Sequence, residues 1–378
     1  MIMTGEASGD LHGASLAREL WKQDPSISLY GVGSKQMREA GVRMLADASE
    51  ISVVGITAVL THLVPIYRVY ANLKRFLKRE RPDLLVLIDF PDFNIMLGKA
   101  AKKLGIPVLY YISPQVWVWR KGRIKTIAGL VKAMIVVFPF EVPLYEKEGV
   151  DVRFVGHPLT DVVRSELTQQ QARSVLGLDA ARRTIALLPG SRKSELVHLL
   201  PDMLKAAKVL SSRFPDLQFV LPLAPTLERE FVLAFVAQGD VPVRMVEGRV
   251  YDVLRASDAA IVASGTATLE TGLMAVPMVI VYRISALNYF ILTKLVRGVK
   301  NVGLVNIVAN KRLVPELVQR ESTPENIADA LMNILDDPAR YQQIRGQLAG
   351  IRAQLGEAGA SRRAASIVLE FLKGSDRV

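Results

Sequence analysis

Cysteine is absent from the 378-residue sequence. Without cysteine the chain can form neither disulfide bonds nor thiolate metal sites, and this composition fits a reducing compartment. A cleavable signal peptide is not visible either, because a small-residue turn begins before any apolar run has developed. We therefore expect a cytoplasmic protein.

Long hydrophobic runs are also missing. The longest apolar stretch, residues 51–64, is interrupted by serine, threonine and histidine. It falls well short of the roughly 20 residues that a membrane-spanning helix needs. The sequence predicts a protein that does not cross a bilayer.

Acidic residues are outnumbered: 48 Lys and Arg stand against 37 Asp and Glu, a net charge of +11. Such an excess indicates an anionic partner, which can be a nucleic acid, a phosphorylated substrate or a membrane surface. Nucleic acid is the least favoured of the three, because zinc-finger spacings, basic heptads and RNA-motif aromatics are not found in the sequence.

Short β-branched runs alternate with helical patterns, which indicates strand–helix–strand units around parallel sheets. At this length, with half of the residues hydrophobic, two domains are expected. Strands are predicted at 1–3, 28–33, 84–89, 107–113, 133–138 and 152–156, and again at 184–190, 218–224, 242–248, 259–264 and 277–283. A connecting helix capped by Thr168 and stopped at Gly177 separates the two series.

We predict an α/β protein of two doubly wound, Rossmann-like domains, residues 1–165 and 166–350. Ligands of such sheets bind beyond the carboxyl ends of the strands, here in a cleft that the two domains face. The last 55 residues look helical from the cap pair Thr323 and Pro324 onward. Residues 351–378 are expected to form a C-terminal helix that packs back toward the first domain.

The opening stretch MIMTGEASGDLHG predicts a short strand, a glycine-rich turn and a helix from about Leu11. A turn of this kind lets another molecule approach the backbone and aims helix N–H groups at it. A tight turn with Asp10 as the helix N-cap explains the stretch equally well.

Two loops in the second half predict a phosphate site. LLPGSRKSE places Ser191 and Arg192 after a strand and a Pro-Gly turn, and SGTATLE repeats the device at Ser264, Gly265 and Thr266. Helix N-termini supply N–H donors and a favourable dipole, and Arg192 adds a bidentate fork. A bound diphosphate is favoured over mere turns, although neither loop is a P-loop and the G-x-G-x-x-G pattern does not occur.

The stretch LIDFPDFN ends an apolar strand on Asp89, followed by Asp92 and Asn94. A carboxylate beside apolar Phe90 and Phe93 can have a raised proton affinity and serve as a general base. A helix cap at Asp92 with a solvated Asp89 is an equally good interpretation. A metal site is disfavoured, because a histidine cluster does not accompany the pair.

Tryptophan is concentrated in YISPQVWVWRKGR, where Trp117 and Trp119 lie close to Arg120 and Lys121. Alternating aromatics are often core, but tryptophans in a loop after a strand, beside basic residues, favour a wall for an amphipathic phosphorylated ligand. His157 follows another strand and is either an orienting hydrogen-bonding group or a catalyst.

Residues 65–79 predict a helix with an apolar stripe of Ile66, Tyr70, Leu73 and Leu77. An ordinary surface helix explains the stripe, but not the preceding apolar run or the one-sided positive charge. We expect reversible docking on an anionic membrane. The predicted docking residues are Leu60, Leu63, Ile66, Arg75, Lys78 and Arg79.

The motifs TGEASGD, VVGI, IDFPDFN, YISPQVWVWR, FPFE, GHPL, LLPGSR, SGTATLE and VPELVQ occur in the order found in lipid-A-disaccharide synthases. The chain resembles this family over essentially its whole length. The first motif together with the tryptophan motif separates it from other nucleotide-sugar glycosyltransferases.

The resemblance implies a GT-B fold and an inverting transfer that needs neither a metal nor another cofactor. The implied donor is UDP-2,3-diacylglucosamine and the implied acceptor is 2,3-diacylglucosamine 1-phosphate (lipid X). The products are the β-1,6-linked lipid A disaccharide 1-phosphate and UDP. The family works at the cytoplasmic face of the inner membrane, and a homodimer is a further expectation from it.

The resemblance also implies roles for individual residues. Asp89 matches the proposed general base, and Glu6 is the second implied catalytic residue. The implied acceptor-binding residues are Ser8, Gly9, Asp10, His12, Asn94, Gln115, Trp117, Arg120 and His157. The implied donor-binding residues are Gly190, Ser191, Arg192, Ser264, Gly265, Thr266, Glu270, Asn306 and Glu316.

Two departures from the family pattern are visible. Members usually carry a longer first strand, which implies a late start at Met1 or a weak central strand, and Val305 stands before Asn306 where proline is commoner. The rival interpretations are a cell-wall N-acetylglucosaminyl transferase, a UDP-sugar 2-epimerase and a non-catalytic, membrane-docked lipid-binding module.

Overall fold

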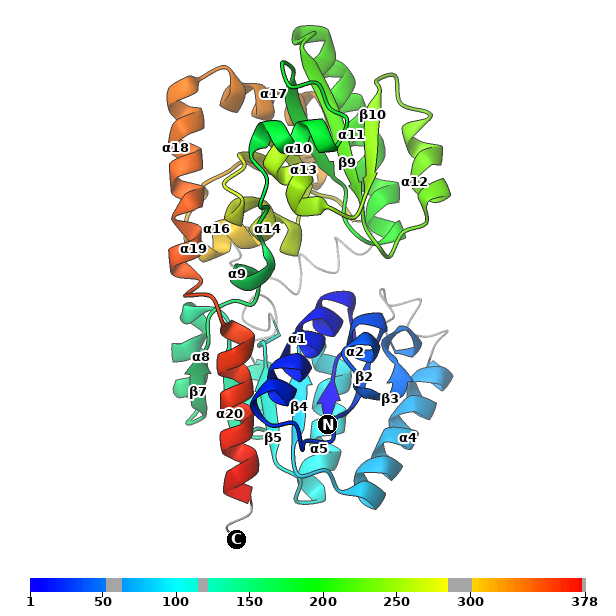
Figure 1. Ribbon diagram of the computed structural model, residues 1–378, viewed down its shortest axis with the longest axis vertical. Coiled ribbons are helices and arrows are strands. Elements are labelled where there is room, and N and C mark those ends of the chain that lie inside the picture. Colours follow the sequence, from blue (N-terminus) through cyan, green and yellow to red (C-terminus); the bar gives the residue numbers. More distant parts are fainter. Residues whose placement is uncertain (52–62, 115–121, 285–300, 376–378) are drawn as a thin grey trace. The chain divides into compact units, whose positions relative to one another are not determined.

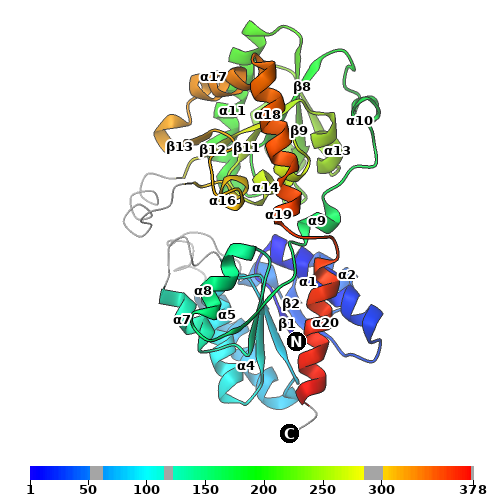
Figure 2. The same cartoon turned by 90° about the vertical axis from the view of Figure 1, so that its left-hand side faces the viewer.

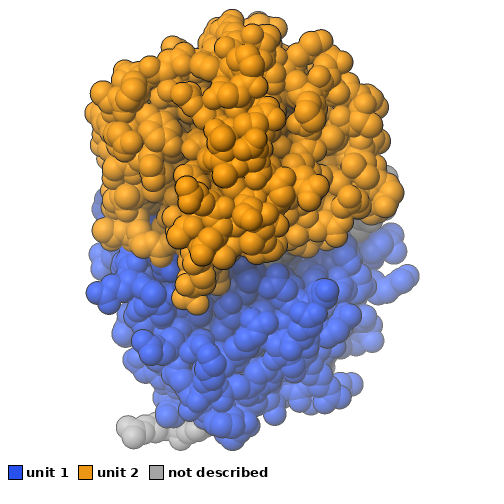
Figure 3. Space-filling view, turned by 45° about the horizontal axis from the view of Figure 1, so that its top comes forward, with its two compact units in different colours: residues 1–161, 355–378 blue, residues 162–354 orange. Residues whose placement is uncertain are grey.

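The computed structural model describes residues 1–51, 63–114, 122–284 and 301–375 (Figure 1). The chain forms two compact units, which Figure 3 shows in different colours. Unit 1 comprises Met1–Asp161 with Leu355–Val378, and unit 2 comprises Val162–Gln354. The sequence placed the divisions a few residues away, at 165/166 and 350/351.

Unit 1 is built on a parallel sheet with the strand order β3-β2-β1-β4-β5-β6-β7. Its strands are β1 (Ile2–Met3), β2 (Tyr30–Gly33), β3 (Arg43–Asp47), β4 (Leu85–Ile88), β5 (Val108–Tyr111), β6 (Ala133–Val136) and β7 (Asp151–Phe154). β3 was not predicted, because its sequence RMLAD has no β-branched residue. β4, β5 and β6 are buried along their whole length, as expected for central strands of a parallel sheet.

The helices of unit 1 cover both faces of this sheet. They are α1 (Ala7–Gln23), α2 (Lys35–Glu39), α4 (Leu63–Glu80), α5 (Pro91–Lys103), α7 (Gly122–Ala128), α8 (Val142–Glu146) and α20 (Ala360–Ser375), with 3-10 turns at Ala48–Glu50 and Pro139–Glu141. The short helix α9 (Leu159–Val162) contains the point in the chain at which unit 1 ends and unit 2 begins. The first helix begins at Ala7 and not near Leu11 as predicted. The C-terminal helix α20 runs alongside α1 in both views (Figures 1 and 2).

Unit 2 has a parallel sheet with the order β10-β9-β8-β11-β12-β13. Its strands are β8 (Arg183–Leu188), β9 (Leu217–Leu223), β10 (Val243–Glu247), β11 (Ala259–Ala263), β12 (Met278–Tyr282) and β13 (Glu316–Val318). Its helices are α10 (Gln169–Val175), α11 (Lys193–Arg213), α12 (Arg229–Val236), α13 (Val250–Ala256), α14 (Thr266–Leu273), α16 (Leu304–Val308), α17 (Pro324–Leu335), α18 (Pro338–Ala349) and α19 (Ile351–Gln354), with a 3-10 turn at Gln319–Glu321. The three-residue β13 was not predicted because it is too short to show a pattern.

Two predicted helix caps are confirmed. The Thr168 hydroxyl accepts a hydrogen bond from the Gln171 amide at the start of α10, and the Thr323 hydroxyl accepts one from the Asn326 amide at the start of α17. A side-chain acceptor at this position satisfies an amide that the helix itself leaves unpaired.

Two glycines allow the chain to pass itself closely in unit 1. Gly156 (φ 81°) and Gly356 (φ 83°) both have left-handed backbones. A Cβ on Gly356 would lie 3.1 Å from the Cα of Gly156, so the two backbone segments are in contact. The amide of His157 donates to the carbonyl of Leu355 (2.8 Å), which fixes this contact beside the start of α20.

The order of each sheet contains one topological switch point. In unit 1 the connections run outward in opposite directions from β1 and β4, and in unit 2 from β8 and β11. Ligands of open parallel sheets bind beyond the carboxyl ends of the strands at such a point. The topology therefore singles out the loops that follow these four strands.

Candidate active site

The loop after β4 has an unusual backbone. Asp89 (φ 44°) and Phe90 (φ 46°) are consecutive left-handed residues, and neither is glycine. Each such residue costs about 1–2 kcal/mol relative to an ordinary conformation. Strain of this kind persists only where surrounding contacts enforce it, and it is concentrated at functional sites.

Side-chain hydrogen bonds hold this strained loop. The carbonyl oxygen of Asp89 accepts hydrogen bonds from the Tyr110 hydroxyl (2.5 Å) and from Asn94 Nδ2 (2.7 Å). Tyr110 and Asn94 are both fully buried. The Asp89 amide donates to the carbonyl of Ile112 (3.2 Å), which also has a left-handed backbone (φ 64°). The ends of β4 and β5 thus support each other.

The loop after β1 packs against the same strained segment. A Cβ on Gly5 would lie 2.2 Å from two ring atoms of Phe90, so only glycine leaves space for the ring. Glu6 follows at once as the N-cap residue of α1, with an extended backbone and a half-buried side chain. The TGEASGD and IDFPDFN motifs therefore meet at the switch point of unit 1.

The predicted acceptor residues of the first motif have different surroundings. Ser8 is half-buried, and Gly9 is buried against Thr4, so that a Cβ added to Gly9 would lie 3.2 Å from the Cβ of Thr4. Asp10 is 3% exposed, and its carboxylate accepts hydrogen bonds from the amides of Ser34 (2.6 Å) and Gln36 (2.9 Å). Asp10 therefore caps α2 and not its own helix, which corrects the N-cap alternative and gives Asp10 a supporting role.

His12 and His157 form a buried pair with ring centroids 6.4 Å apart in an edge-to-face arrangement. Burial lowers the pKa of His12 to about 4. Burial, with a smaller contribution from His12, lowers the pKa of His157 to about 3. His157 Nδ1 accepts a hydrogen bond from the Leu159 amide (3.1 Å), so the proton of the neutral ring is on Nε2. Both side chains are neutral near pH 7.

Asp92 is exposed and forms an ion pair with Arg123 of α7. The N-cap residue of α5 is Phe90, so the alternative in which Asp92 caps this helix is wrong. The third polar residue of the motif, Asn94, donates from Nδ2 to the carbonyls of Ile88 and Asp89. Its Oδ1 is buried and has no hydrogen-bond partner among the described residues.

Several predicted residues lie outside the described residues. These are Gln115, Trp117 and Arg120 of the tryptophan motif, and Leu60 of the predicted docking surface; the side chain of Leu63 is likewise not described.

Helix α4 divides its apolar residues between the core and the surface. Leu73 and Leu77 are buried in the main core cluster of unit 1, and Ile66 packs against that cluster. Ile66, a predicted docking residue, is therefore only partly exposed. Val64 and Tyr67, which were not predicted, are 69% and 71% exposed. The basic residues Arg75, Lys78 and Arg79 are exposed as expected.

In unit 2 the loop after β8 turns on Gly190, which has a left-handed backbone (φ 109°). Ser191 is exposed, and the side chain of Arg192 is 45% exposed. Glu195 of α11 accepts hydrogen bonds from the amides of Ser191 (3.0 Å) and Arg192 (3.3 Å), and from Arg192 Nη1 (3.2 Å). The amides that were predicted to face a phosphate are thus engaged by the carboxylate of their own helix.

The loop after β11 turns on Gly265, whose backbone (φ 151°) is outside the usual range for other residues. The Ser264 hydroxyl donates to the carbonyl of Val302 (2.8 Å), and Thr266 is the exposed first residue of α14. Glu270, one turn further, accepts a hydrogen bond from the Tyr251 hydroxyl (3.0 Å). Burial raises the pKa of Glu270, although the Tyr251 hydrogen bond opposes this.

Asn306 and Glu316 are buried and bonded to the surrounding chain. Glu316 accepts hydrogen bonds from the amides of Val302 (2.8 Å) and Gly303 (3.0 Å) and from Asn306 Nδ2 (2.8 Å). Asn306 Oδ1 accepts from the amide of Leu313 (2.8 Å). Both side chains therefore hold the chain at Val302 and Gly303, just before α16, and their predicted role in donor binding stays a prediction.

Sequence reasoning missed four polar side chains that pair with the predicted site residues: Tyr110, Arg123, Glu195 and Tyr251. Tyr110 sits in an apolar strand and has no sequence signal, because its partner is a main-chain carbonyl. Glu195 did carry a signal, since an acidic residue in the first turn of a helix is a common partner of unpaired amides.

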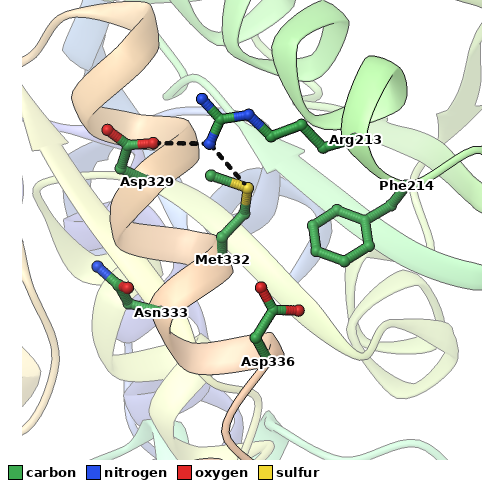
Figure 4. A pocket seen from close by; sticks show the side chains of 6 residues that line it. All are labelled: Arg213, Phe214, Asp329, Met332, Asn333 and Asp336. Carbon is green, nitrogen blue, oxygen red and sulfur yellow. Dashed lines mark hydrogen bonds and ion pairs between the residues drawn. The ribbon is translucent and has the colours of Figure 1, made fainter.

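A surface hollow in unit 2 lies away from the switch point. It is lined by Arg213 and Phe214 at the end of α11 and by four residues of α17 and its C-cap (Figure 4). The Arg213 guanidinium donates a hydrogen bond to the Asp329 carboxylate (2.9 Å), so the positive charge of Arg213 is already paired. The C-terminal ends of these helices lie at the amino edge of the sheet, opposite the loops described above.

The described ranges contain no group of three or more histidine and carboxylate side chains arranged to hold a metal ion. Among the helices of the same ranges, none combines the length and the apolarity that are needed to span a membrane.

Comparison with known proteins decides the family. The family model described as lipid-A-disaccharide synthetase matches residues 1–371. The chain belongs to the lipid-A-disaccharide synthase family. It is 50% identical over 372 residues to the lipid-A-disaccharide synthase of Geobacter metallireducens, covering 98% of this chain and 97% of that one. It is 44% identical over 375 residues to the enzyme of Nitrosococcus oceani, with 99% and 96% covered. Its activity is therefore that of a lipid-A-disaccharide synthase, a glycosyltransferase of lipid A biosynthesis.

Solved structures show the fold. A putative UDP-N-acetylglucosamine 2-epimerase from Listeria monocytogenes aligns with a TM-score of 0.67 at 14% identity, over 100% of this chain and 97% of that one. MurG of Acinetobacter baumannii aligns with a TM-score of 0.59 at 16% identity, over 98% and 99%. The predicted GT-B architecture of parallel α/β sheets with C-terminal helices is confirmed.

Proposed function

We propose that the protein condenses UDP-2,3-diacylglucosamine with 2,3-diacylglucosamine 1-phosphate to give the β-1,6-linked lipid A disaccharide 1-phosphate and UDP. The observation that carries this proposal is the loop at the switch point of unit 1. There a carboxylate, Asp89, stands on a strained backbone that buried side chains hold in place. Such pre-organisation is typical of a catalytic group.

In the proposed reaction Asp89 is the general base. Its carboxylate removes the proton of the acceptor 6-hydroxyl while that oxygen attacks the anomeric carbon of the donor. The new C–O bond forms on the face opposite the leaving UDP, whose bond to the sugar breaks, so the configuration inverts. Glu6, on the neighbouring loop, orients the acceptor. General-base catalysis by a positioned side chain contributes about 10²- to 10⁴-fold to the rate.

Unit 2 is proposed to bind the donor. The leaving UDP gains negative charge in the transition state, and fixed donors stabilise such charge most effectively where they need not reorganise. The candidate hydrogen-bond donors to the UDP are Arg192 and the backbone amides at the starts of α11 and α14. Because Glu195 now accepts from Ser191 and Arg192, a diphosphate must replace this carboxylate as their partner. Donor binding therefore exchanges one anion for another.

Membrane docking is proposed for the surface of α4 and α5. Val64 and Tyr67 on α4, and Met96 on α5, are 69%, 71% and 44% exposed. The exposed bases Arg75, Lys78 and Arg79 continue along α4. Pulling an acyl chain into water costs about 0.8 kcal/mol per methylene, so an enzyme with acylated substrates benefits from working at the bilayer. A peripheral position on the inner face of the inner membrane follows, while the homodimer remains a prediction.

The decisive experiment supplies the purified protein with both acylated substrates. Formation of disaccharide 1-phosphate together with an equal amount of UDP supports the proposal. Rejection of unacylated UDP-glucosamine as donor separates this activity from cell-wall transfer. UDP-sugar turnover without an acceptor would instead indicate an epimerase, and tight lipid binding without UDP release a non-catalytic lipid-binding module.

The docking proposal has its own test. A variant with Val64 and Tyr67 both replaced by aspartate is compared with wild type for sedimentation with anionic vesicles. We expect most of the variant to remain in the supernatant. A matched variant with Val175→Asp, a 51% exposed apolar residue in unit 2, should sediment like wild type. Equal sedimentation of all three proteins would contradict docking through α4.

A further inference from the structure

The backbone that carries Asp89 depends on contacts from another strand. Asp89 and Phe90 are both left-handed, so the peptide between them is held in an orientation that the two residues do not favour alone. The carbonyl of this peptide is the oxygen that accepts from Tyr110 and Asn94. Fixing this carbonyl fixes ψ of Asp89 and φ of Phe90.

Tyr110 is well suited to this task. It lies on β5, the neighbour of β4 in the sheet, and its side chain is fully buried. Its hydroxyl donates to the Asp89 carbonyl at 2.5 Å, the shorter of the two contacts. Burial, and secondarily the charge of Asp89, raise the pKa of Tyr110 well above its usual value. The hydroxyl therefore remains protonated, and a donor, at any working pH.

Loss of this contact would affect the carboxylate and not the overall fold. If the peptide after Asp89 rotates toward an ordinary turn, the backbone angles of Asp89 change and its side chain leaves the direction that the strained conformation gives it. A rotation of this size displaces a reacting group enough to slow turnover strongly. The Phe90 ring, which rests against Gly5, would move with it.

We propose that Tyr110 is a positioning residue for glycosyl transfer, whose hydroxyl holds the Asp89–Phe90 peptide and thereby aims the Asp89 carboxylate at the acceptor hydroxyl. The proposal rests on the proposed function, in which Asp89 is the general base. Tyr110 itself touches neither substrate in this assignment.

The test is the variant Tyr110→Phe, which removes one oxygen and keeps the ring. We expect kcat to fall about tenfold, as expected for loss of one buried hydrogen bond. KM for each acylated substrate should stay within twofold of wild type, because no binding contact is removed. Circular dichroism melting shows whether the variant remains folded.

Tyr111→Phe is the matched control. Tyr111 is the next residue of β5 and equally buried, but its side chain is on the opposite face of the sheet, near Asp161 and Arg363. The same atom is lost from the same strand, so any general effect on the strand appears in both variants. We expect kcat of Tyr111→Phe to stay within twofold of wild type.

Three results would overturn the positioning role: a kcat of Tyr110→Phe within twofold of wild type, an equal loss of kcat in Tyr111→Phe, or a rise in KM that accounts for the whole loss. Asp89→Asn, assayed in parallel, separates this outcome from failure of the proposed function. If Asp89→Asn is inactive while Tyr110→Phe is unimpaired, only the positioning role fails. If Asp89→Asn turns over like wild type, the general base and its positioning residue are both wrong.

Discussion

In unit 1 the loop that carries the candidate base turns on Asp89 and Phe90, whereas the loops at the switch point of unit 2 turn on Gly190 and Gly265. All four residues have positive φ. Glycine adopts this conformation freely, while the other two residues must be held in it. The non-glycine loop is held by buried side chains, and the glycine loops carry exposed ones such as Ser191 and Thr266.

The difference teaches how one fold can divide two tasks. A base must be aimed at one proton, and a strained loop with buried anchors gives a single direction. A diphosphate is large and charged, and a glycine turn lets it approach the backbone while exposed donors adapt to it. We therefore interpret unit 1 as the half that positions chemistry and unit 2 as the half that accommodates a charged group.

The largest expected effect breaks the unit 1 side of this comparison. Asp89→Asn keeps the shape of the side chain but removes its basicity, so we expect kcat to fall about 10³-fold, within the range for general bases. Initial rates of UDP release measure the loss. Asp92→Asn is the matched variant, because Asp92 is an exposed acid of the same motif that is paired with Arg123. A severe loss in Asp92→Asn with normal turnover in Asp89→Asn would exchange the two roles.

The next effect breaks the unit 2 side. Arg192→Ala removes the exposed guanidinium beside Gly190. We expect kcat/KM for the UDP-sugar to fall about 100-fold, because the negative charge on the leaving UDP loses one stabilising hydrogen-bond donor. Arg229→Ala is the control, since Arg229 is similarly exposed (48%) and similarly paired, with Glu247, but begins α12, which follows β9 and not one of the switch-point strands. Equal losses in the two variants would mean that net positive charge, and not the position of Arg192, matters.

Much of this arrangement could be predicted from the sequence, and the failures have physical causes. The parallel strands were visible because a buried strand is a continuous apolar run, as in LVLI of β4. The stripe of α4 gave the helix but not which apolar residues face outward: Ile66 packs on the core while Tyr67 is exposed. Ile66 and Tyr67 are consecutive, so a rotation of α4 by one residue would exchange their positions. Only the packing of the helix against the sheet decides which of the two faces the core.

The sequence predicted which residues belong to the candidate site, but not their hydrogen-bond partners. Asp89 and Arg192 were expected from their motifs, but Asp10 was expected to face a ligand or to cap α1, and it caps α2. Its partners are main-chain amides more than 20 residues away, which leave no trace in local sequence. The same reason hid Tyr110, whose partner is a carbonyl that only a left-handed backbone brings within reach.

A third prediction sharpens the comparison through glycine itself. Gly5→Ala places a methyl group 2.2 Å from the Phe90 ring, and we expect it to lower the free energy of unfolding by about 3 kcal/mol, at the upper end for overpacking. Urea unfolding measures the change. Gly265→Ala meets nothing within 4 Å and strains only its backbone, so a loss of about 1 kcal/mol is expected there. A larger loss at Gly265 than at Gly5 would reverse the contrast between a packed loop and an open one.

The smallest effect concerns the buried histidines of unit 1. In the folded protein the pKa of His12 is about 4, below its usual value of 6.5. Between these pH values His12 therefore binds a proton in the unfolded chain but not in the folded protein. Stability is therefore fully present above pH 6.5 and is lost as the pH falls toward 4. At pH 5 the loss from this residue is about 2 kcal/mol relative to pH 7.

His12→Leu removes this titration, so its free energy of unfolding should fall less steeply than that of wild type between pH 6.5 and 4. Urea unfolding at several pH values gives both curves, and the difference in slope, not the absolute stability, is the quantity of interest. His157 is retained in both proteins and continues to contribute, since burial lowers its pKa to about 3. Parallel curves would show that His12 is protonated as easily in the folded protein as in the unfolded chain. The His12 side chain would then be hydrated in the folded protein.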